Sequence, residues 1–288
     1  MLHSGNWLVA VKQVKSQFAL FRLVPLDERE NSNSLKVPRS KIVLMRIAVV
    51  SDIHGNRTAF EAVLADLQQT SPDLILHGGD LADAGASASE IVDHIRDLGW
   101  RGVVGNTDEM LFRPVSLEEF ASQSSAPPSL WAAVRETAAW TRTMLGEERI
   151  AWLGALPPVQ LQGPLALVHA SPESSWRAPA PEASDDELES VYGPLGKPVA
   201  IYGHIHRPYI RKLPNAEIRD RLVINTGSVS LSYDGDCRAS YLLLDGPSAS
   251  IRRVEYDIEK ELRALSSCDM PHADWVAKIL STGAAQMP

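Results

Sequence analysis

Seven side chains that could bind metal ions follow five apolar segments of the chain, at the points where strands are expected to end. They are Asp52, His54, Asp80, Asn106, His169, His204 and His206. No cysteine is among them, so a closed structural zinc site is not expected. Aspartate, histidine and asparagine together suit divalent ions such as Mn²⁺, Fe²⁺ or Zn²⁺. One ion rarely needs seven such ligands, whereas two ions that share a carboxylate would use all of them. Two ions about 3.5–4 Å apart can bind a phosphate group and generate hydroxide for in-line attack.

Each of these motifs has a simpler explanation when it is taken alone. The segments D-I-H, G-G-D and G-N-T-D are common where a strand turns into a loop. A lone histidine such as His169 is more often buried and hydrogen-bonded than a metal ligand. The segment G-H-I-H at 203–206 is more specific, because two histidines two residues apart on an extended chain share one face. The occurrence of all five in one chain, each at an expected strand end, favours a single metal centre.

The elements around the first three motifs predict a parallel sheet covered by helices. Apolar runs over 41–52, 73–80 and 101–106 are typical of buried parallel strands. Between them, residues 58–67 and 87–98 place apolar side chains at helical spacing. This βαβαβ order predicts an α/β fold. Ligands of such sheets bind outside the carboxyl ends of the strands, where these motifs lie.

The second half of the chain predicts a helical insertion and a second sheet. Residues 108–156 are mostly of helical type, with proline breakers, and we expect them to lie over or beside the first sheet. Seven short strands follow, punctuated by Gly, Pro, Asn and Asp, and suit a second sheet that is mixed or antiparallel. They are expected at 158–162, 164–170, 197–204, 208–213, 221–228, 239–245 and 250–256.

Three segments are expected along the chain: an extension or linker over 1–44, a catalytic domain over 45–258, and a C-terminal helix and tail over 259–288. Residues 1–44 carry seven basic and three acidic side chains and no signal-peptide pattern. The segment MRIAVVSDIHGN begins at Met45 and includes the first expected strand. We predict that residues 45–288 fold and remain active without the extension.

Composition limits the classes of partner. A formal net charge of −8 argues against generic nucleic-acid binding, which needs clustered Lys and Arg. No apolar run approaches the roughly 20 residues of a membrane-spanning helix. The two cysteines are too few for a disulfide framework, and we expect reduced thiols and a cytoplasmic protein. The sequence leaves the oligomeric state open.

The ordered motifs resemble those of the calcineurin-like metallophosphoesterases over about residues 45–256. They are Asp52-Ile53-His54-Gly55-Asn56, Gly79-Asp80, Gly105-Asn106-x-Asp108, His169 and Gly203-His204-Ile205-His206. The third motif has the GNxD form of small prokaryotic members. The resemblance implies a four-layer α/β/β/α sandwich and two divalent ions, with manganese expected and iron, zinc or nickel as alternatives.

The resemblance also implies a role for each ligand. Asp52, His54, Asp80 and His206 would bind one ion, and Asp80, Asn106, His169 and His204 the other. Asp80 would bridge the two, and metal-bound hydroxide would attack phosphorus, with Asp80 and Asn106 as the catalytic residues. Arg207, Thr107 and Asp108 are the candidates for substrate binding.

The departures from the family pattern bear on the substrate. Relatives that hydrolyse phosphoprotein monoesters usually carry histidine at the position of Thr107 and arginine at that of Ala84. That histidine is associated with protonation of the leaving group, and Asp83, three residues after Asp80, would be its usual support. We therefore expect metal-dependent hydrolysis of phosphate esters, and of phosphodiesters above all.

Several alternatives stay open. They are a phosphomonoesterase, a nucleotide pyrophosphohydrolase, and a scaffold or binding protein on the same fold that lacks activity. The completeness of the ligand set favours an enzyme over a scaffold. Trp176, in the loop after His169, is a hypothesis for stacking on a base, and an ordinary loop aromatic is its competing interpretation.

Overall fold

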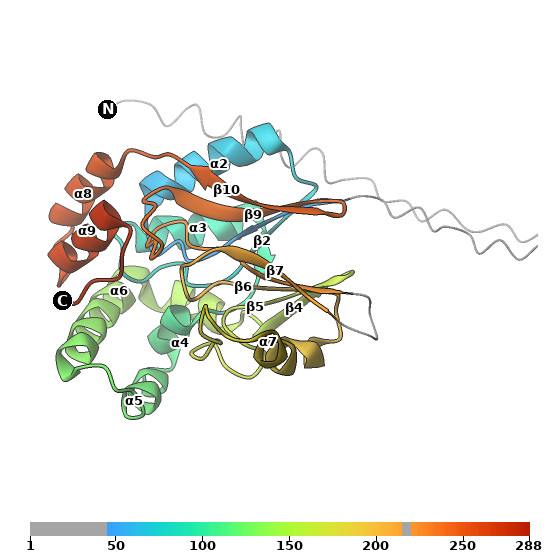
Figure 1. Ribbon diagram of the computed structural model, residues 1–288. Coiled ribbons are helices and arrows are strands. Elements are labelled where there is room, and N and C mark those ends of the chain that lie inside the picture. Colours follow the sequence, from blue (N-terminus) through green and yellow to red (C-terminus); the bar gives the residue numbers. More distant parts are fainter. Residues whose placement is uncertain (1–44, 215–219) are drawn as a thin grey trace, which may run out of the picture. The chain divides into compact units, whose positions relative to one another are not determined.

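Two five-stranded mixed sheets form the centre of the fold, with helices on their outer faces (Figure 1). The computed structural model describes residues 45–214 and 220–288. The predictions for residues 1–44 lie outside this range. The layer order is helix, sheet, sheet, helix, as expected from the sequence.

The first sheet has the strand order β10-β9-β1-β2-β3. Strands β1, β2 and β3 run parallel. Strand β9 pairs antiparallel with β1, and β10 pairs antiparallel with β9 at the edge of the sheet. The strands span Arg46–Val50 (β1), Leu74–His77 (β2), Arg101–Gly102 (β3), Ala239–Asp245 (β9) and Ser248–Val254 (β10). The helices between the parallel strands are α2 (Arg57–Thr70) and α3 (Ala88–Leu98).

The second sheet has the order β4-β5-β6-β8-β7. Its parallel strands β5, β6 and β8 are flanked by antiparallel β4 and β7. They span Val159–Gln162 (β4), Leu165–Val168 (β5), Val199–Tyr202 (β6), Tyr209–Leu213 (β7) and Arg221–Asn225 (β8). Helix α7 (Asp185–Tyr192) and the 3₁₀ turn η1 (Gly193–Leu195) precede β6.

The expectation that residues 239–245 and 250–256 belong to the second sheet was wrong. Leu242 and Leu244 of β9 pack with Ile47 and Val49 of β1 between the sheets. Tyr241, on the opposite face of β9, packs into the core under the helices. Strand β9 is apolar on both faces, which suits an interior position in the first sheet.

The alternation of side chains along the strands builds both cores. In β1, Ile47 and Val49 point between the sheets, whereas Ala48 and Val50 point to the helices that cover the first sheet. Each fully buried Val or Ile side chain contributes roughly 1.5–3 kcal/mol of transfer free energy. A third core lies outside the second sheet, where Tyr192 of α7 packs on Tyr202 of β6.

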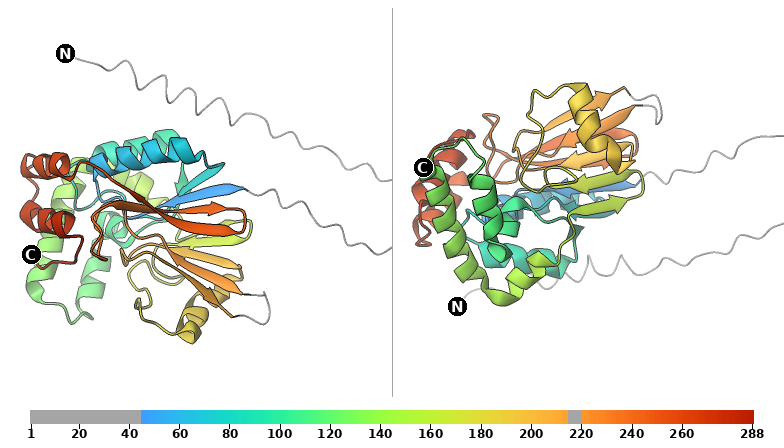
Figure 2. Two further views of the ribbon diagram at one scale, coloured as in Figure 1. Left: turned by 45° about the horizontal axis from the view of Figure 1, so that its top comes forward. Right: turned by 90° about the horizontal axis from the view of Figure 1, so that it is seen from below.

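The expected helical insertion is a set of three helices: α4 (Asn106–Phe112), α5 (Val115–Ala121) and α6 (Pro128–Gly154). Helix α6 consists of two pieces, because Gly146 interrupts it with φ +70°. Ala138, Leu145, Ile150 and Leu153 of α6 join the core on the outer face of the first sheet. The insertion is therefore part of the main core. Figure 2 shows α6, in light green, beside the helices that cover the first sheet.

The C-terminal region contains α8 (Ile258–Ser266) and α9 (Ala273–Thr282), where one helix and a loose tail were expected. Val276, Ile279 and Leu280 of α9 bury one face against Leu265 of α8 and Leu231, which explains the second helix. Over residues 45–214 and 220–288, no helix combines the length and apolar character that a membrane crossing requires.

Candidate metal centre

The seven predicted ligands converge at the carboxyl ends of the strands of both sheets. Asp52 and His54 follow β1, Asp80 follows β2, and Asn106 begins α4 just after β3. The second sheet contributes the other three: His169 follows β5, and His204 and His206 follow β6. The site therefore depends on the packing of one sheet on the other, because neither sheet carries a complete set.

One group of ligands is enclosed in the protein. Asp52, His54, Asp80 and His206 are all buried, and each offers a ligand atom within 4.8 Å of those of the other three. His206 Nε2 lies 3.1 Å from Asp52 Oδ1, and His54 Nε2 lies 3.7 Å from Asp80 Oδ2. This group has two carboxylates and two imidazoles, a donor set that suits a divalent ion.

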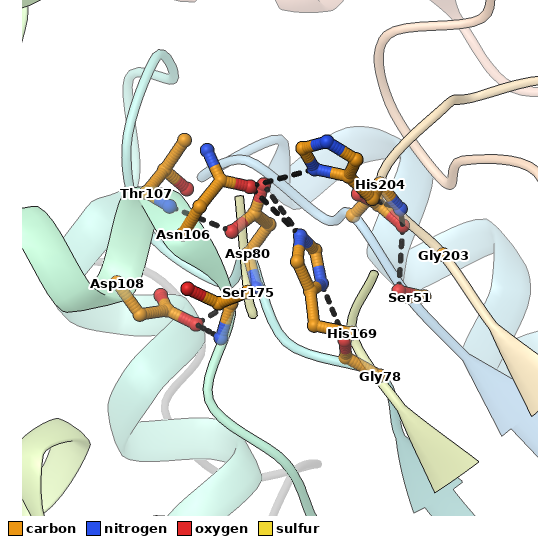
Figure 3. A network of polar contacts seen from close by, with 12 residues as sticks. Ser51, Gly78, Asp80, Asn106, Thr107, Asp108, His169, Ser175, Gly203 and His204 are labelled. Carbon is orange, nitrogen blue, oxygen red and sulfur yellow. Dashed lines mark hydrogen bonds and ion pairs between the residues drawn. The ribbon is translucent and has the colours of Figure 1, made fainter. Parts of the chain in front are cut away.

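A second group of candidate ligands also includes Asp80. Figure 3 shows its side chains, Asp80, Asn106, His169 and His204, turned toward one another. Asn106 Oδ1 lies 2.9 Å from His169 Nε2 and 2.8 Å from His204 Nδ1. His169 Nε2 is in turn 3.4 Å from Asp80 Oδ2. Asn106 and His204 are only half-buried, so this is the side from which a substrate can reach the centre.

Backbone carbonyls fix three of the histidine rings. The Nδ1 atoms of His54 and His169 contact the carbonyl oxygens of Asp83 (2.9 Å) and Gly78 (2.7 Å). Nδ1 of His206 contacts the carbonyl oxygen of Leu231. A neutral imidazole that donates through Nδ1 presents a lone pair at Nε2, which is the form that binds metal ions.

The arrangement fits a cation between the rings. His54 Nε2 and His206 Nε2 are 3.3 Å apart, and both rings donate through Nδ1 to a carbonyl. Burial lowers the pKa of His54, the largest effect on that ring, and this favours its neutral form. The Asp80 and Asp52 carboxylates lie beside these two nitrogens, so a divalent ion between the rings would have imidazole and carboxylate ligands together.

The backbone is strained at five of the seven ligands. Asp52, His54, Asp80, His204 and His206 all have φ between +48° and +66°. The left-handed region is unfavourable for residues other than glycine, and each such residue costs on the order of 1–3 kcal/mol. Hydrogen bonds between the loops hold this conformation. The amides of Ile53 and His54 both donate to the carbonyl oxygen of Asp80.

Two glycines allow the carboxylates to approach the backbone. A Cβ atom at Gly105 would lie 2.0 Å from Asp80 Oδ1, and one at Gly203 would lie 2.3 Å from Asp52 Oδ2. Neither distance is possible for a real side chain. The glycines of the G-N and G-H motifs are therefore needed for close packing around the ligands.

Burial and neighbouring charges shift the pKa values of Asp80, His169 and His204 in different directions. Burial would raise the pKa of Asp80, but His169 and His54 outweigh it and lower this pKa well below its usual range. Burial would lower the pKa of His169, yet the charge of Asp80 raises it to about 9. Burial, reinforced by His169, lowers the pKa of His204 to about 4. In the absence of metal, His169 therefore carries the proton that balances Asp80.

The structure gives Asp108 a role other than the predicted contact with substrate. Its carboxylate is fully buried and accepts hydrogen bonds from the backbone amides of Asp80 (2.8 Å), Leu81 (2.9 Å) and Gly105 (3.1 Å). These hydrogen bonds join the loop that contains Asp80 to the first turn of α4. Burial, followed by the charge of Asp80, raises the pKa of Asp108 to about 7.

The other two substrate-binding candidates lie beside the centre. The amide of Thr107 donates to Asp80 Oδ1 at 2.9 Å. Its hydroxyl is buried and has no hydrogen-bond partner among the described residues. Arg207 is exposed and donates through Nε to the carbonyl oxygen of Tyr233 at 3.1 Å. Contact of either residue with a substrate stays a prediction.

Supporting residues of the site were missed at the level of sequence. Thr141 of α6 donates to the Asp83 carboxylate at 2.7 Å, and the carbonyl of the same aspartate contacts His54. Ser228 donates to the carbonyl oxygen of Asp52 at 2.8 Å. Ser228 ends the segment Asn225-Thr226-Gly227-Ser228, whose composition is typical of a turn. Thr141 gave no signal, because nothing in its helix distinguishes it from a core threonine.

A family model described as the calcineurin-like phosphoesterase superfamily domain matches residues 45–247. The chain belongs to the calcineurin-like phosphoesterases. The fold described above is that of a metallophosphoesterase, a hydrolase that acts on phosphate esters. The buried Asp52, His54, Asp80 and His206 could hold divalent metal, as in this family.

Individual relatives agree with this assignment. The chain is 31% identical over 260 residues to the uncharacterised protein MJ0912 of Methanocaldococcus jannaschii, with 84% of this chain and all of that protein covered. A metallophosphoesterase from Sphaerobacter thermophilus is 26% identical, with a TM-score of 0.67 over 83% of this chain and 99% of that one. The hypothetical protein PH1004 of Pyrococcus horikoshii shares the fold at 18% identity, with a TM-score of 0.69 over 84% and 99% of the two chains.

Proposed function

We propose that this calcineurin-like phosphoesterase hydrolyses small phosphodiesters at a centre of two divalent ions. The observation that carries the proposal is the position of Asp80. Its carboxylate lies 3.7 Å from His54 Nε2 in the enclosed group and 3.4 Å from His169 Nε2 in the open group. One carboxylate is thus close to both sets of candidate ligands, which supports a shared role.

The residues present suit two ions of the kind that bind oxygen and nitrogen. Asp52, His54, Asp80 and His206 would hold one ion, and Asp80, Asn106, His169 and His204 the second. When bound, such ions lower the pKa of water and neutralise the charge of phosphate oxygens. Manganese is the metal we expect, and iron, zinc or nickel would suit the same donors.

The chain's own residues orient the reacting groups. The carbonyl contacts of the histidine rings leave Nε2 directed at the centre, so little reorganisation is needed when a substrate binds. Asn106 Oδ1 lies between two imidazoles at the open side, which fixes the amide at the edge where a phosphate would enter. Asp80 and Asn106 are therefore the residues we place at the reacting phosphate.

The threonine at position 107 favours a phosphodiester over a phosphomonoester as the substrate. The family's phosphoprotein monoesterases usually carry histidine at this position, and threonine has no group that titrates near neutral pH to protonate a leaving alkoxide. Asp83, the usual partner of that histidine, is instead bonded to Thr141. Hydrolysis without this acid requires a leaving group of low pKa, or a diester whose single negative charge repels the nucleophile less.

The test compares bis(4-nitrophenyl) phosphate with 4-nitrophenyl phosphate in Mn²⁺. Hydrolysis of the diester should require metal. It should fall by on the order of 100-fold or more in Asp80→Asn, because loss of even an outer-shell partner costs about 10–100-fold. Thr143→Val, on an exposed face of α6, serves as the control variant.

Other outcomes would change the proposal in defined ways. Hydrolysis of the monoester alone would keep the metal centre and overturn the diester assignment. Cleavage restricted to a nucleotide pyrophosphate bond would favour a pyrophosphohydrolase. Full activity of Asp80→Asn would contradict the shared ligand.

A further inference from the structure

A cleft of about 520 Å³ opens beside the metal centre, and the function proposed above does not account for it. One wall is formed by α4, α5 and Gln123, and the other by the loop 171–177 that follows β5. His169, a predicted ligand of the open group, lines the cleft. A group bound there would therefore be continuous with a phosphate at the metal ions.

The cleft has a fixed wall. Glu109 of α4 accepts hydrogen bonds from Ser175 Oγ at 2.5 Å and Trp176 Nε1 at 3.1 Å. One carboxylate thus ties the loop to the helix that begins at Asn106. The volume lies within the roughly 300–1,000 Å³ of small-molecule sites, which is larger than a phosphate group alone requires.

Aromatic side chains dominate the apolar part of the cleft. Phe112, Phe120 and Trp176 all line it. The rings of Phe120 and Trp176 lie 5.1 Å apart with an interplanar angle of 33°. Arg177 lies over the Phe120 ring at 5.3 Å, held by Gln123 at 2.6 Å. Such surfaces bind flat aromatic groups through stacking.

The charges of the cleft do not favour a second phosphate. Its lining includes three carboxylates and two guanidinium groups. Arg113 is paired with Glu109 at 2.9 Å and with Glu119 at 2.6 Å. Two carboxylates therefore neutralise the charge of Arg113. Arg177 instead contacts the Phe120 ring and the side-chain amide of Gln123. An uncharged group is the better fit.

We infer that this cleft binds a neutral aromatic ester group of the substrate, of the size of a nucleoside. The inference rests on the proposed function, since the phosphate of the same molecule would lie at the metal centre. It names the class of diester: one with a nucleoside or a comparable aryl group on one side of the phosphate. Trp176 is the residue we expect to stack on that group.

The test is a calorimetric titration of the Mn²⁺-loaded full chain with adenosine 5′-monophosphate, ribose 5-phosphate and inorganic phosphate. The first two ligands differ only in the base. The nucleotide should bind roughly 5- to 150-fold more tightly, the range of one base–aromatic stack. Ribose 1,5-bisphosphate, with a phosphate in place of the base, should bind no more tightly than ribose 5-phosphate.

Variants locate the effect in the cleft. Trp176→Ala should remove the advantage of the nucleotide and leave the affinity for inorganic phosphate unchanged, whereas Trp176→Phe should retain most of it. The matched control is Trp275→Ala, which removes a half-buried indole of α9 that does not line the cleft. The comparison of ligands on the unaltered protein stands even where a variant does not fold.

The outcomes separate the two proposals. Equal binding of the nucleotide and ribose 5-phosphate, beside normal binding of inorganic phosphate, would overturn the cleft assignment alone. An equal loss of affinity for all three ligands in Trp176→Ala would also overturn it. Failure of the metal-loaded protein to bind inorganic phosphate would overturn both proposals.

Discussion

At the scale of single residues, the titration of the site follows from the pairing of buried groups. Asp80 and His169 lie 3.4 Å apart and are both buried. The carboxylate raises the pKa of the imidazole to about 9, although burial alone would lower it. His54, in contrast, has a lowered pKa because of burial. The metal-free site is therefore charged at His169 and neutral at His54.

This difference predicts proton release on metal binding at the open group. A ligand imidazole must be neutral, so metal must displace the proton of His169 at any pH below about 9. Affinity for the second ion should rise with pH up to about 9 and then level off. Calorimetry at pH 7 in buffers of different ionisation enthalpy should detect about one proton released per second ion. Absence of proton release at pH 7 would contradict the assignment.

At the scale of elements, short loops after the strands bring the candidate ligands together. The elements packed against these loops limit which substitutions each loop can accept. The turn after β3 brings Gly105 against the Asp80 carboxylate. Helix α6 packs against the turn after β2, where Thr141 donates a hydrogen bond to the Asp83 carboxylate. Each contact yields a prediction about one element.

Gly105→Ala should damage the metal centre without a change in any ligand. The new Cβ atom would lie 2.0 Å from Asp80 Oδ1, so the carboxylate or the start of α4 must move. Hydrolysis should fall about 100-fold, since displacements of 1 Å can cost this much. Gly154→Ala is the control, because its Cβ atom would meet Phe112 at an ordinary 3.4 Å. Equal activities of the two variants would refute the packing argument.

Thr141→Val should weaken both the fold and the site. The change leaves the buried Asp83 carboxylate without its hydroxyl donor, which costs about 1–3 kcal/mol of unfolding free energy. Because the carbonyl of Asp83 contacts His54, manganese affinity should fall as well. Urea denaturation of the metal-free protein and a manganese titration measure the two effects.

The matched control for this change is Thr143→Val, two residues along the same helix. Its hydroxyl bonds only the carbonyl of Ala139 at an exposed position, so its effect should stay within about 0.5 kcal/mol. Similar losses in both variants would mean that the helix, and not the Asp83 contact, is the cause.

At the scale of the whole molecule, the two sheets must pack together before the site exists. Ile47, Leu76, Leu167 and Ile201 form an apolar core between the sheets, directly below the loops that carry the ligands. The described residues from Met45 onward belong to one compact unit. The match to the calcineurin-like family also begins at residue 45.

A chain that starts at Met45 should therefore fold and hydrolyse the same substrates. Its manganese-dependent rate should stay within about twofold of the full chain, the range of changes remote from buried features. Thermal unfolding followed by circular dichroism, beside the diester assay, gives the measurement. An insoluble or inactive product would show that residues 1–44 are structural.

The sequence by itself determined the family, the layered fold and the seven candidate ligands that the structure brings together. It could do so because strand ends and ligand types are local features, and parallel strands bring their carboxyl ends to one edge. The tertiary structure decided the rest. It placed β9 and β10 in the first sheet, buried Asp108 against three amides, and brought Thr141 to Asp83. These contacts join residues far apart in the chain, and their partners are often backbone atoms, which carry no sequence signal.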